Sequence, residues 1–326
     1  MPGQNRVAFA RDFQIPYMQQ WNAAVQRELP GQQTLTVAYV GSKGTHLSQS
    51  VNLNQAMPGD GSVASRRRWP QHATVNLFQS AGVSSYHSLQ ATLAKRFAQG
   101  VSYNLGYTYS HYLDMGSQGG NGASPISLIS IANQSIYKGN AEQDLRHQFR
   151  GTFQYELPFG PGKRYLSQGV SSAVLGGWTL NGAISMYTGI PFTVTAPNTL
   201  NIGEGSWADR TGNGTLPSSG AYLARWFDDG AFNNPGFRMW GNGGRNTLFG
   251  PGTNQWDFSV FKNFQVRETM RLQFRTEMFN AFNTPQFNNP ASAIGSTNTG
   301  RISSAGSETT LQRTQRQVQF ALKLIF

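Results

Sequence analysis

The sequence has no cysteine, no long hydrophobic run and only 13% charged residues, and each absence narrows what it can encode. Without cysteine the chain can form neither disulfides nor thiolate metal sites. No stretch approaches the roughly 18 apolar residues that a membrane-spanning helix requires. Residues 1–13 lack the apolar core of a secretory signal, which by itself indicates a cytoplasmic protein if the chain is complete.

The net charge of +11 raises the question of a nucleic-acid partner. However, the lysines and arginines are scattered singly along the chain, and their one tight cluster is residues 66–68 beside Trp69. A single cluster in an expected loop is weak support for a nucleic-acid site. We therefore expect no nucleic-acid partner.

Glycine and aromatic residues are abundant: the 326 residues include 37 Gly, 21 Phe, 12 Tyr and 7 Trp. This mixture suits strands and turns better than helices. Period-two alternation supports an all-β fold. In residues 147–157, "HQFRGTFQYEL", one face carries Phe149, Phe153, Tyr155 and Leu157, and the other face carries only polar or charged side chains.

About nine strands of this kind are predicted, and several are longer than the five or six residues usual in soluble sheets. Strands of roughly 9–11 residues are long enough to cross a bilayer. The predicted ranges are 17–29, 33–41, 85–97, 101–110, 147–157, 174–188, 256–266, 271–279 and 316–326.

The predicted connections alternate between short and long. Short turns are expected at residues 29–32, 98–100, 158–164 and 267–269, and long loops at about 42–84, 114–145, 189–255 and 282–315. In an antiparallel up-and-down sheet, all the short turns then lie on one rim, with the C-terminus. Outer-membrane barrels have short periplasmic turns and long extracellular loops, whereas compact soluble domains rarely hold four such loops. The sequence thus predicts an antiparallel transmembrane β-barrel.

No constellation of catalytic or metal-ligating residues stands out, so we expect no enzymatic activity, metal or cofactor. The five histidines have no paired ligand spacing, and the chain contains no GxxxxGK[ST], GxSxG or HExxH motif. Charge pairing on strand faces explains Glu156 with Arg150 and Glu277 with Arg275. Residues 140–151 are expected to hold their loop to the barrel rim.

The long loop around residues 224–246 is rich in aromatic side chains, among them Trp226, Phe227 and Trp240. These side chains are candidates for ligand contacts. A loop of this length must also bury something in order to be ordered, so packing is the first explanation for them.

Several stretches, taken in order, resemble the C-terminal barrel half of Oar-like TonB-dependent outer-membrane receptors. They are residues 19–47, 86–114, 144–166, 175–195, 225–235 and 272–287, for example "LQFRTEMFNAFNTPQF". The resemblance implies a 22-stranded barrel in the cell outer membrane of a Gram-negative bacterium. It also implies an N-terminal plug, a TonB box, often a regulatory-like domain, and a signal peptide.

The sequence lacks all four of these N-terminal parts, and about nine strands are too few for such a barrel. We therefore expect residues 1–326 to be the C-terminal part of a larger receptor, from a truncated or split gene. The expected partners are outer-membrane lipid, an unknown transported ligand and, through the missing N-terminal part, the TonB complex.

The last strand carries apolar residues at alternate positions and ends on an aromatic residue. Phe320, Leu322, Leu324 and Phe326 match the pattern that the barrel-assembly machinery reads in such receptors, according to the resemblance. The alternative to a receptor barrel is a soluble β-sandwich or barrel that binds glycans through its aromatic loops. It predicts apolar faces packed against one another, and alternation alone does not separate the two.

Overall fold

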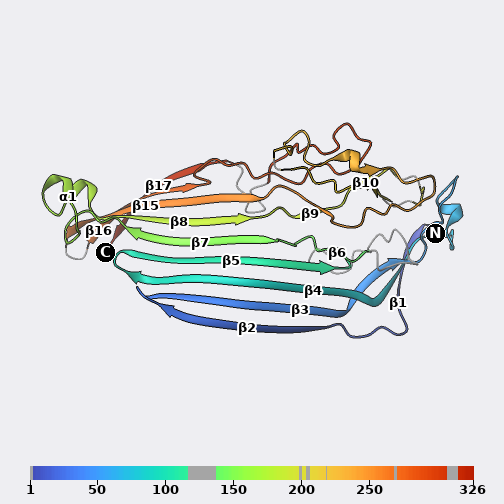
Figure 1. The fold of residues 1–326 in the computed structure, drawn as a ribbon, viewed down its shortest axis with the longest axis horizontal. Helices are drawn as coiled ribbons and strands as arrows, with labels where there is room; N and C mark the ends of the chain where they lie inside the picture. Colours follow the sequence, from blue (N-terminus) through green and yellow to red (C-terminus); the bar gives the residue numbers. More distant parts are fainter. Residues whose placement is uncertain are drawn as a thin grey trace.

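One large antiparallel sheet dominates the computed structural model of the chain (Figure 1). Its nine long strands follow the order β17-β16-β15-β8-β7-β5-β4-β3-β2. The structure describes residues 3–116, 137–197, 200–202, 206–217, 219–267, 270–306 and 315–326.

The nine strands confirm the predicted number and, for most of them, the predicted position. They are β2 (Tyr17–Leu29), β3 (Gln33–Asn52), β4 (His72–Ala98), β5 (Val101–Asp114), β7 (His147–Glu156), β8 (Trp178–Tyr187), β15 (Thr253–Arg267), β16 (Met270–Phe279) and β17 (Gln317–Ile325). Neither β2 nor β17 has a strand on its outer edge among the described residues. The barrel wall is therefore open at both sides.

Strands β3 and β4 are much longer than predicted. Their pairing continues to Asn52 opposite Asn76, with register shifts after Gly44 and Leu47. The predicted long loop at 42–84 is wrong in extent, because only residues 53–71 connect the two strands. Backbone pairing does not require alternating side chains, so the sequence pattern ends before the strands do.

A parallel strand was not expected at all. The N-terminal β1 (Gln4–Phe9) pairs in parallel with β4, and Phe9 stacks on Phe78 with ring centroids 5.2 Å apart. A second short strand, β6 (Gly139–Asn140), adds to the end of β5.

The short connections gather at one end of the sheet, which we call the turn rim, and the C-terminus lies there too (Figure 1). Residues 30–32 and 99–100 are tight turns, as predicted. In the predicted 267–269 turn, Glu268 and Thr269 lie outside the described residues, while Arg267 pairs with Met270. The long connections lie at the opposite end, the loop rim.

The connection between β7 and β8 differs from the prediction. It runs over residues 157–177 and contains a helix, α1 (Gly169–Leu175), where the strand was expected to begin at residue 174. The residues at 169–175 have no alternating pattern, and the strand starts at Trp178.

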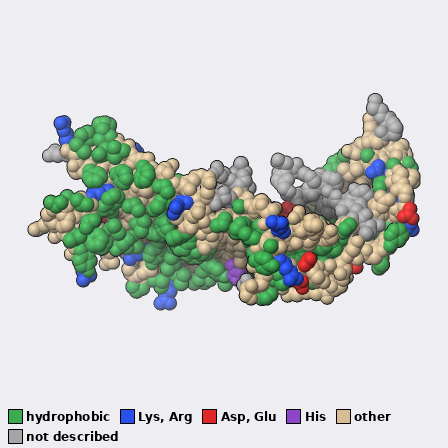
Figure 2. All heavy atoms as spheres, turned by 90° about the horizontal axis from the view of Figure 1, so that it is seen from above, with side chains coloured by type: hydrophobic (Ala, Val, Ile, Leu, Met, Phe, Trp, Pro, Cys, Tyr) green, Lys and Arg blue, Asp and Glu red, His purple; other side chains and the backbone are tan. Residues whose placement is uncertain are grey.

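The sheet has one apolar face and one polar face. Register places Leu180, Val260, Thr276 and Phe320 side by side on the apolar face. Hydrophobic side chains cover the half of the molecule built from long strands, whereas polar atoms prevail in the loop half (Figure 2). The apolar face is thus a surface rather than a core.

The buried core lies among the loops instead. The 188–252 loop and residues 280–306 form a folded unit, the loop cap, around Phe192, Val194, Phe227 and Phe232. Short elements within the loops are η1 (Ala64–Arg66), β9 (Pro191–Phe192), β10 (Thr195–Ala196), β11 (Ser206–Trp207), β12 (Asp209–Arg210), η3 (Asp229–Ala231), β13 (Phe232–Asn233) and β14 (Leu248–Phe249).

Candidate functional site

The residues of the predicted assembly signal lie on and just beyond the edge strand β17. Phe320 is 71% exposed, Leu322 and Leu324 are exposed beside it, and Phe326 is 87% exposed at the end of the chain. The ring of Phe320 stacks on Phe274 of β16 with centroids 6.4 Å apart. Such a row of bare apolar side chains would be unfavourable in water and is favourable against hydrocarbon.

Amphipathic aromatic and histidine side chains border the apolar face toward the loop rim. The hydroxyl of Tyr39 lies 2.7 Å from Nδ1 of His87, and that of Tyr107 lies 2.7 Å from Nδ1 of His147. The Trp21 ring lies across Gly41, where a Cβ atom would fall 2.3 Å from the indole nitrogen. Belts of this kind mark the membrane interfaces of β-barrels.

The opposite face is lined mainly by uncharged polar side chains. In register, Asn104 lies opposite Thr152, and Asn181 lies between Gln154 and Ser259. Polar, hydrated side chains are typical of a barrel lumen. The polar face is therefore a candidate wall for a ligand path.

Of the two ion pairs predicted on the polar face, one is confirmed and the other is wrong. Arg275 Nη1 lies 3.4 Å from Glu277 Oε1, as expected. Glu156 pairs instead with Lys163 Nζ at 2.6 Å, in the 157–177 connection. The predicted partner Arg150 is six residues away along β7, about 20 Å in a strand, so the two side chains cannot meet.

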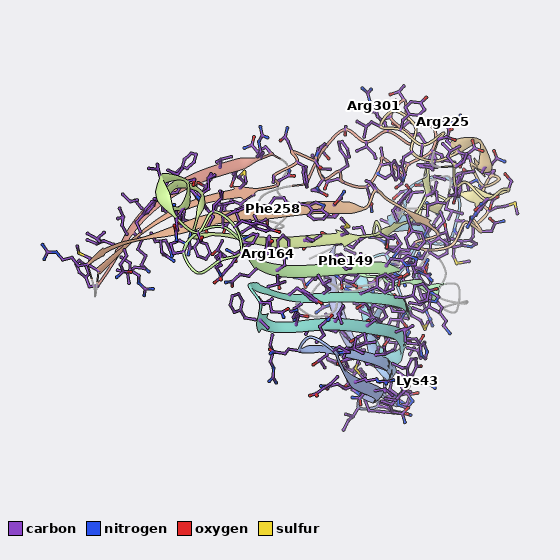
Figure 3. All side chains as sticks on the ribbon, turned by 60° about the vertical axis from the view of Figure 1, so that its left-hand side comes forward. Lys43, Phe149, Arg164, Arg225, Phe258 and Arg301 are labelled. Atoms are coloured by element: carbon purple, nitrogen blue, oxygen red, sulfur yellow. The ribbon has the colours of Figure 1, made fainter. Side chains whose placement is uncertain are left out.

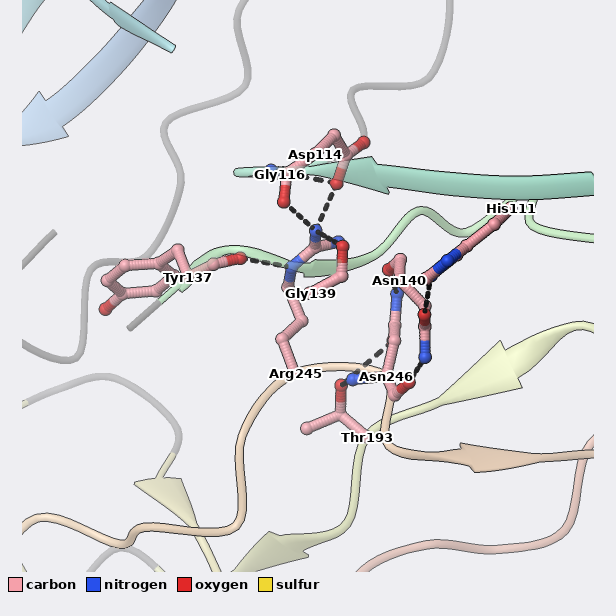
Figure 4. Close-up of polar contacts among 9 residues, drawn as sticks. All are labelled: His111, Asp114, Gly116, Tyr137, Gly139, Asn140, Thr193, Arg245 and Asn246. Carbon is pink, nitrogen blue, oxygen red and sulfur yellow. Dashed lines mark hydrogen bonds and ion pairs between the residues drawn. The ribbon is translucent and has the colours of Figure 1, made fainter. Parts of the chain in front are cut away.

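Arg245 ties the loop cap to the barrel wall (Figure 4). Its guanidinium donates to the backbone carbonyl oxygens of Tyr137, at 3.0 Å, and Asp114, at 2.8 Å, and it also contacts the Asp114 carboxylate. Both side chains are largely buried. One side chain from the long loop thus binds the end of β5 and the segment that begins at Tyr137.

Asn246 continues this attachment. Its side-chain amide donates to the carbonyl oxygen of Asn140 at 2.8 Å, and the Asn140 amide donates back to the carbonyl oxygen of Asn246 at the same distance. His111 and Arg146 both contact the Asn140 side-chain oxygen, at 3.2 and 2.9 Å. This reciprocal pairing fixes the loop cap in one position on the wall.

Residues 140–151 hold their loop to the rim, as predicted. The fully buried carboxylate of Asp144 accepts hydrogen bonds from Arg146 Nε and from the backbone N–H of Tyr112, both at 2.8 Å. A buried carboxylate is stable when donors satisfy it in this way.

The three aromatic candidates for ligand contact have different environments. Phe227 is only 1% exposed, at the centre of the loop cap, and packs against Phe192 and Phe232. Trp226 is half-buried and donates its indole N–H to the carbonyl oxygen of Phe249 at 2.9 Å. Trp240 is half-buried against the second cluster of Val51, Tyr137 and Trp207. Loop packing therefore engages all three.

Sequence reasoning missed Arg245 and Asn246 altogether. Both belong to "GNGGRN", which reads as a flexible turn. The available signal was a lone arginine within a glycine-rich loop, and nothing in the sequence shows that Asp114 lies beside it.

Metal-binding clusters and membrane-crossing helices are both absent from the described ranges. No three histidine, cysteine, aspartate or glutamate side chains come together there in a way that could hold a metal ion. Nor does any helix in these ranges have the length and hydropathy of a membrane-crossing helix.

A sheet with one bare apolar face, one polar face and loops gathered at one rim defines the wall of a membrane β-barrel. The chain belongs to the family described as outer membrane beta barrel domain, which matches residues 1–319. The protein is therefore located in the cell outer membrane. No curated protein matches the sequence.

Solved structures of three outer-membrane proteins are similar to the chain over most of its length. The chain is similar to the outer membrane transporter YddB from Escherichia coli, with a TM-score of 0.51 at 8% identity, over 99% of this chain and 34% of that one. It is also similar to the pyoverdine receptor FpvA from Pseudomonas aeruginosa (TM-score 0.43, 12% identity, 95% and 30%) and to the ferric preacinetobactin receptor BauA from Acinetobacter baumannii (0.42, 12%, 94% and 29%). The chain thus spans about a third of the length of these proteins.

Proposed function

We propose that residues 1–326 form part of the barrel wall of an Oar-like TonB-dependent receptor that takes up a ligand across the outer membrane. The observation that carries this proposal is that the wall is open. It consists of nine membrane-length strands, and its two edge strands, β2 and β17, have no outer neighbour among the described residues. A lipid-embedded wall must satisfy these edges with further strands. A larger barrel supplies them.

In this proposal the turn rim is periplasmic and the loop rim extracellular. The polar face lines the lumen, and the loop cap closes the outer mouth above it, with Trp226 and Trp240 available at its surface. The protein acts as a receptor and transporter, not as an enzyme. The barrel-assembly machinery inserts it, and the TonB complex engages a segment outside this chain.

The soluble glycan-binding alternative predicts two apolar faces in contact. The described part of the chain has one main sheet, and its apolar face is uncovered. This arrangement favours the membrane barrel over the sandwich.

Cysteine accessibility tests the proposed orientation, because the chain has no cysteine of its own. Met57 is 72% exposed on the connection between β3 and β4, and Gln99 is exposed in the tight turn between β4 and β5 at the turn rim. With Met57→Cys and Gln99→Cys in the full receptor, a membrane-impermeant maleimide should label only residue 57 on intact cells and both residues after permeabilisation. Labelling of residue 99 on intact cells would contradict the orientation.

A further inference from the structure

The connection between β7 and β8 is folded back onto the apolar face of the barrel wall. Lys262 of β15 shows this most directly. Its neighbours in register are Trp178 and Phe274, so it occupies an apolar-face position. Its ammonium group donates to the backbone carbonyl oxygen of Val174, at 3.0 Å, and to that of Ala173. The C-terminal turn of α1 therefore lies over the outside of the wall.

Lys262 is only 4% exposed, although it lies on a face that is otherwise open. Carbonyl groups at a helix C-terminus lack partners within the helix and attract positive charge. The ammonium group also lies 4.9 Å from the ring centre of Phe264 and 5.6 Å from that of Trp178. The indole N–H of Trp178 donates to the same Val174 carbonyl oxygen at 3.0 Å. Two side chains of the wall thus hold α1 in place.

The apolar side chains of the connection face away from the protein. Val170 is 81% exposed, and Val174, Leu175, Tyr165 and Leu166 are also exposed. A short helix held firmly against the wall, with its valines and leucine uncovered, buries little apolar area within the protein. Through Lys262 and Trp178, α1 adjoins the apolar face of β15 and β8.

The charge of the connection is positive. Residues 157–177 contain Lys163 and Arg164 but no aspartate or glutamate. Lys163 pairs with Glu156 at the end of β7, whereas Arg164 has no carboxylate partner among the described residues. The Arg164 guanidinium lies 5.3 Å from the ring centre of Tyr165, and in Figure 3 it lies beside α1, at the end of the molecule opposite Arg225 and Arg301. Exposed apolar side chains next to basic ones are typical of segments that lie in a membrane interface.

We propose that residues 158–177 are an interfacial anchor that binds anionic phospholipid in the leaflet at the turn rim. Val170, Val174 and Leu175 enter the acyl boundary, and Arg164 lies at the level of the lipid phosphates. Lys262 fixes the anchor to the wall and keeps its own charge out of hydrocarbon. This inference rests on the proposed membrane orientation and adds a lipid site to it.

The test uses single-cysteine variants of the full receptor, each labelled with the fluorophore NBD. The receptor is reconstituted into vesicles of phosphatidylethanolamine and phosphatidylglycerol that carry a spin-labelled quencher near the headgroup or deep in the acyl region. Val170→Cys probes the anchor, Phe320→Cys the lipid-facing wall, and Met57→Cys the opposite rim. We expect the headgroup-region quencher to act on residue 170 at least about twofold more than on residue 57.

The three labels separate the anchor from the barrel itself. The anchor would be wrong if the label at residue 320 is quenched while the label at residue 170 is as accessible to water as the label at residue 57. That result would leave the lipid-facing wall intact. Absence of quenching at residue 320 would contradict the lipid-facing wall, and the anchor with it. In the variant Arg164→Gln, quenching at residue 170 should lose its dependence on phosphatidylglycerol; retained dependence would overturn the assignment of Arg164 to the phosphates.

Discussion

The guanidinium of Arg245 contacts the carboxylate of Asp114, although 131 positions separate the two residues in the chain. The contact joins the longest loop to the end of a wall strand. It turns a loop that could otherwise move freely into a cap with a fixed position over the barrel mouth.

Removing one partner of this pair should loosen the cap. Arg245→Met removes the positive charge from beside the buried Asp114 carboxylate, which keeps the backbone N–H of Gly116 as a donor. Loss of one charged partner costs about 3–5 kcal/mol in comparable buried pairs. We expect faster amide hydrogen exchange in residues 188–252 and unchanged exchange in β7 and β8. Unchanged exchange throughout the loop would contradict the role of Arg245. Arg225→Met is a matched control, since the Arg225 pair with Asp228 is exposed.

Phe227 and Trp240 should respond differently to truncation. Phe227→Ala removes a fully buried ring from the loop cap and should destabilise the cap by about 3–5 kcal/mol. Trp240→Ala removes a half-buried ring and should leave most of the cap folded. Limited proteolysis of the purified chain measures both effects. Equal protease resistance of the Phe227→Ala variant and the parent would contradict the cap core described above.

Lys262 should hold α1 through its charge rather than its length. Lys262→Met keeps an apolar side chain of similar length but leaves the carbonyl oxygens of Ala173 and Val174 without this donor, at a cost of about 1–3 kcal/mol. A spin label at residue 170 should become more mobile in Lys262→Met and stay restricted in Lys262→Arg. Equal mobility in both variants would contradict the attachment.

The sequence predicted the sheet well because alternation records which side chains face lipid. Strand β2 begins and ends as predicted, and β7 ends one residue early. The prediction from the sequence failed where strands pair without alternating side chains, as in the outer halves of β3 and β4. It also failed where distant segments come together, as in the parallel pairing of β1 with β4.

The candidate site was less predictable for the same physical reason. The aromatic side chains of residues 224–246 stand out in the sequence, but their burial depends on partners from several loops. Arg245 and Lys262 carry no local pattern at all. Their roles arise from the carbonyl oxygens and the carboxylate that the fold brings to them.

If alternate residues of the wall face lipid and lumen, two adjacent positions of β17 should respond differently to the same charge. Phe320→Arg places a charge on the lipid face, which costs roughly 2–4 kcal/mol near the middle of a bilayer. Gln319→Arg places the same charge on the polar face, where Gln319 already contacts Glu277. The measurement is the amount of full-length receptor recovered from the outer membrane. We expect a large loss for Phe320→Arg and near-normal recovery for Gln319→Arg. Equal recovery of the two variants would show that the two positions do not face different environments.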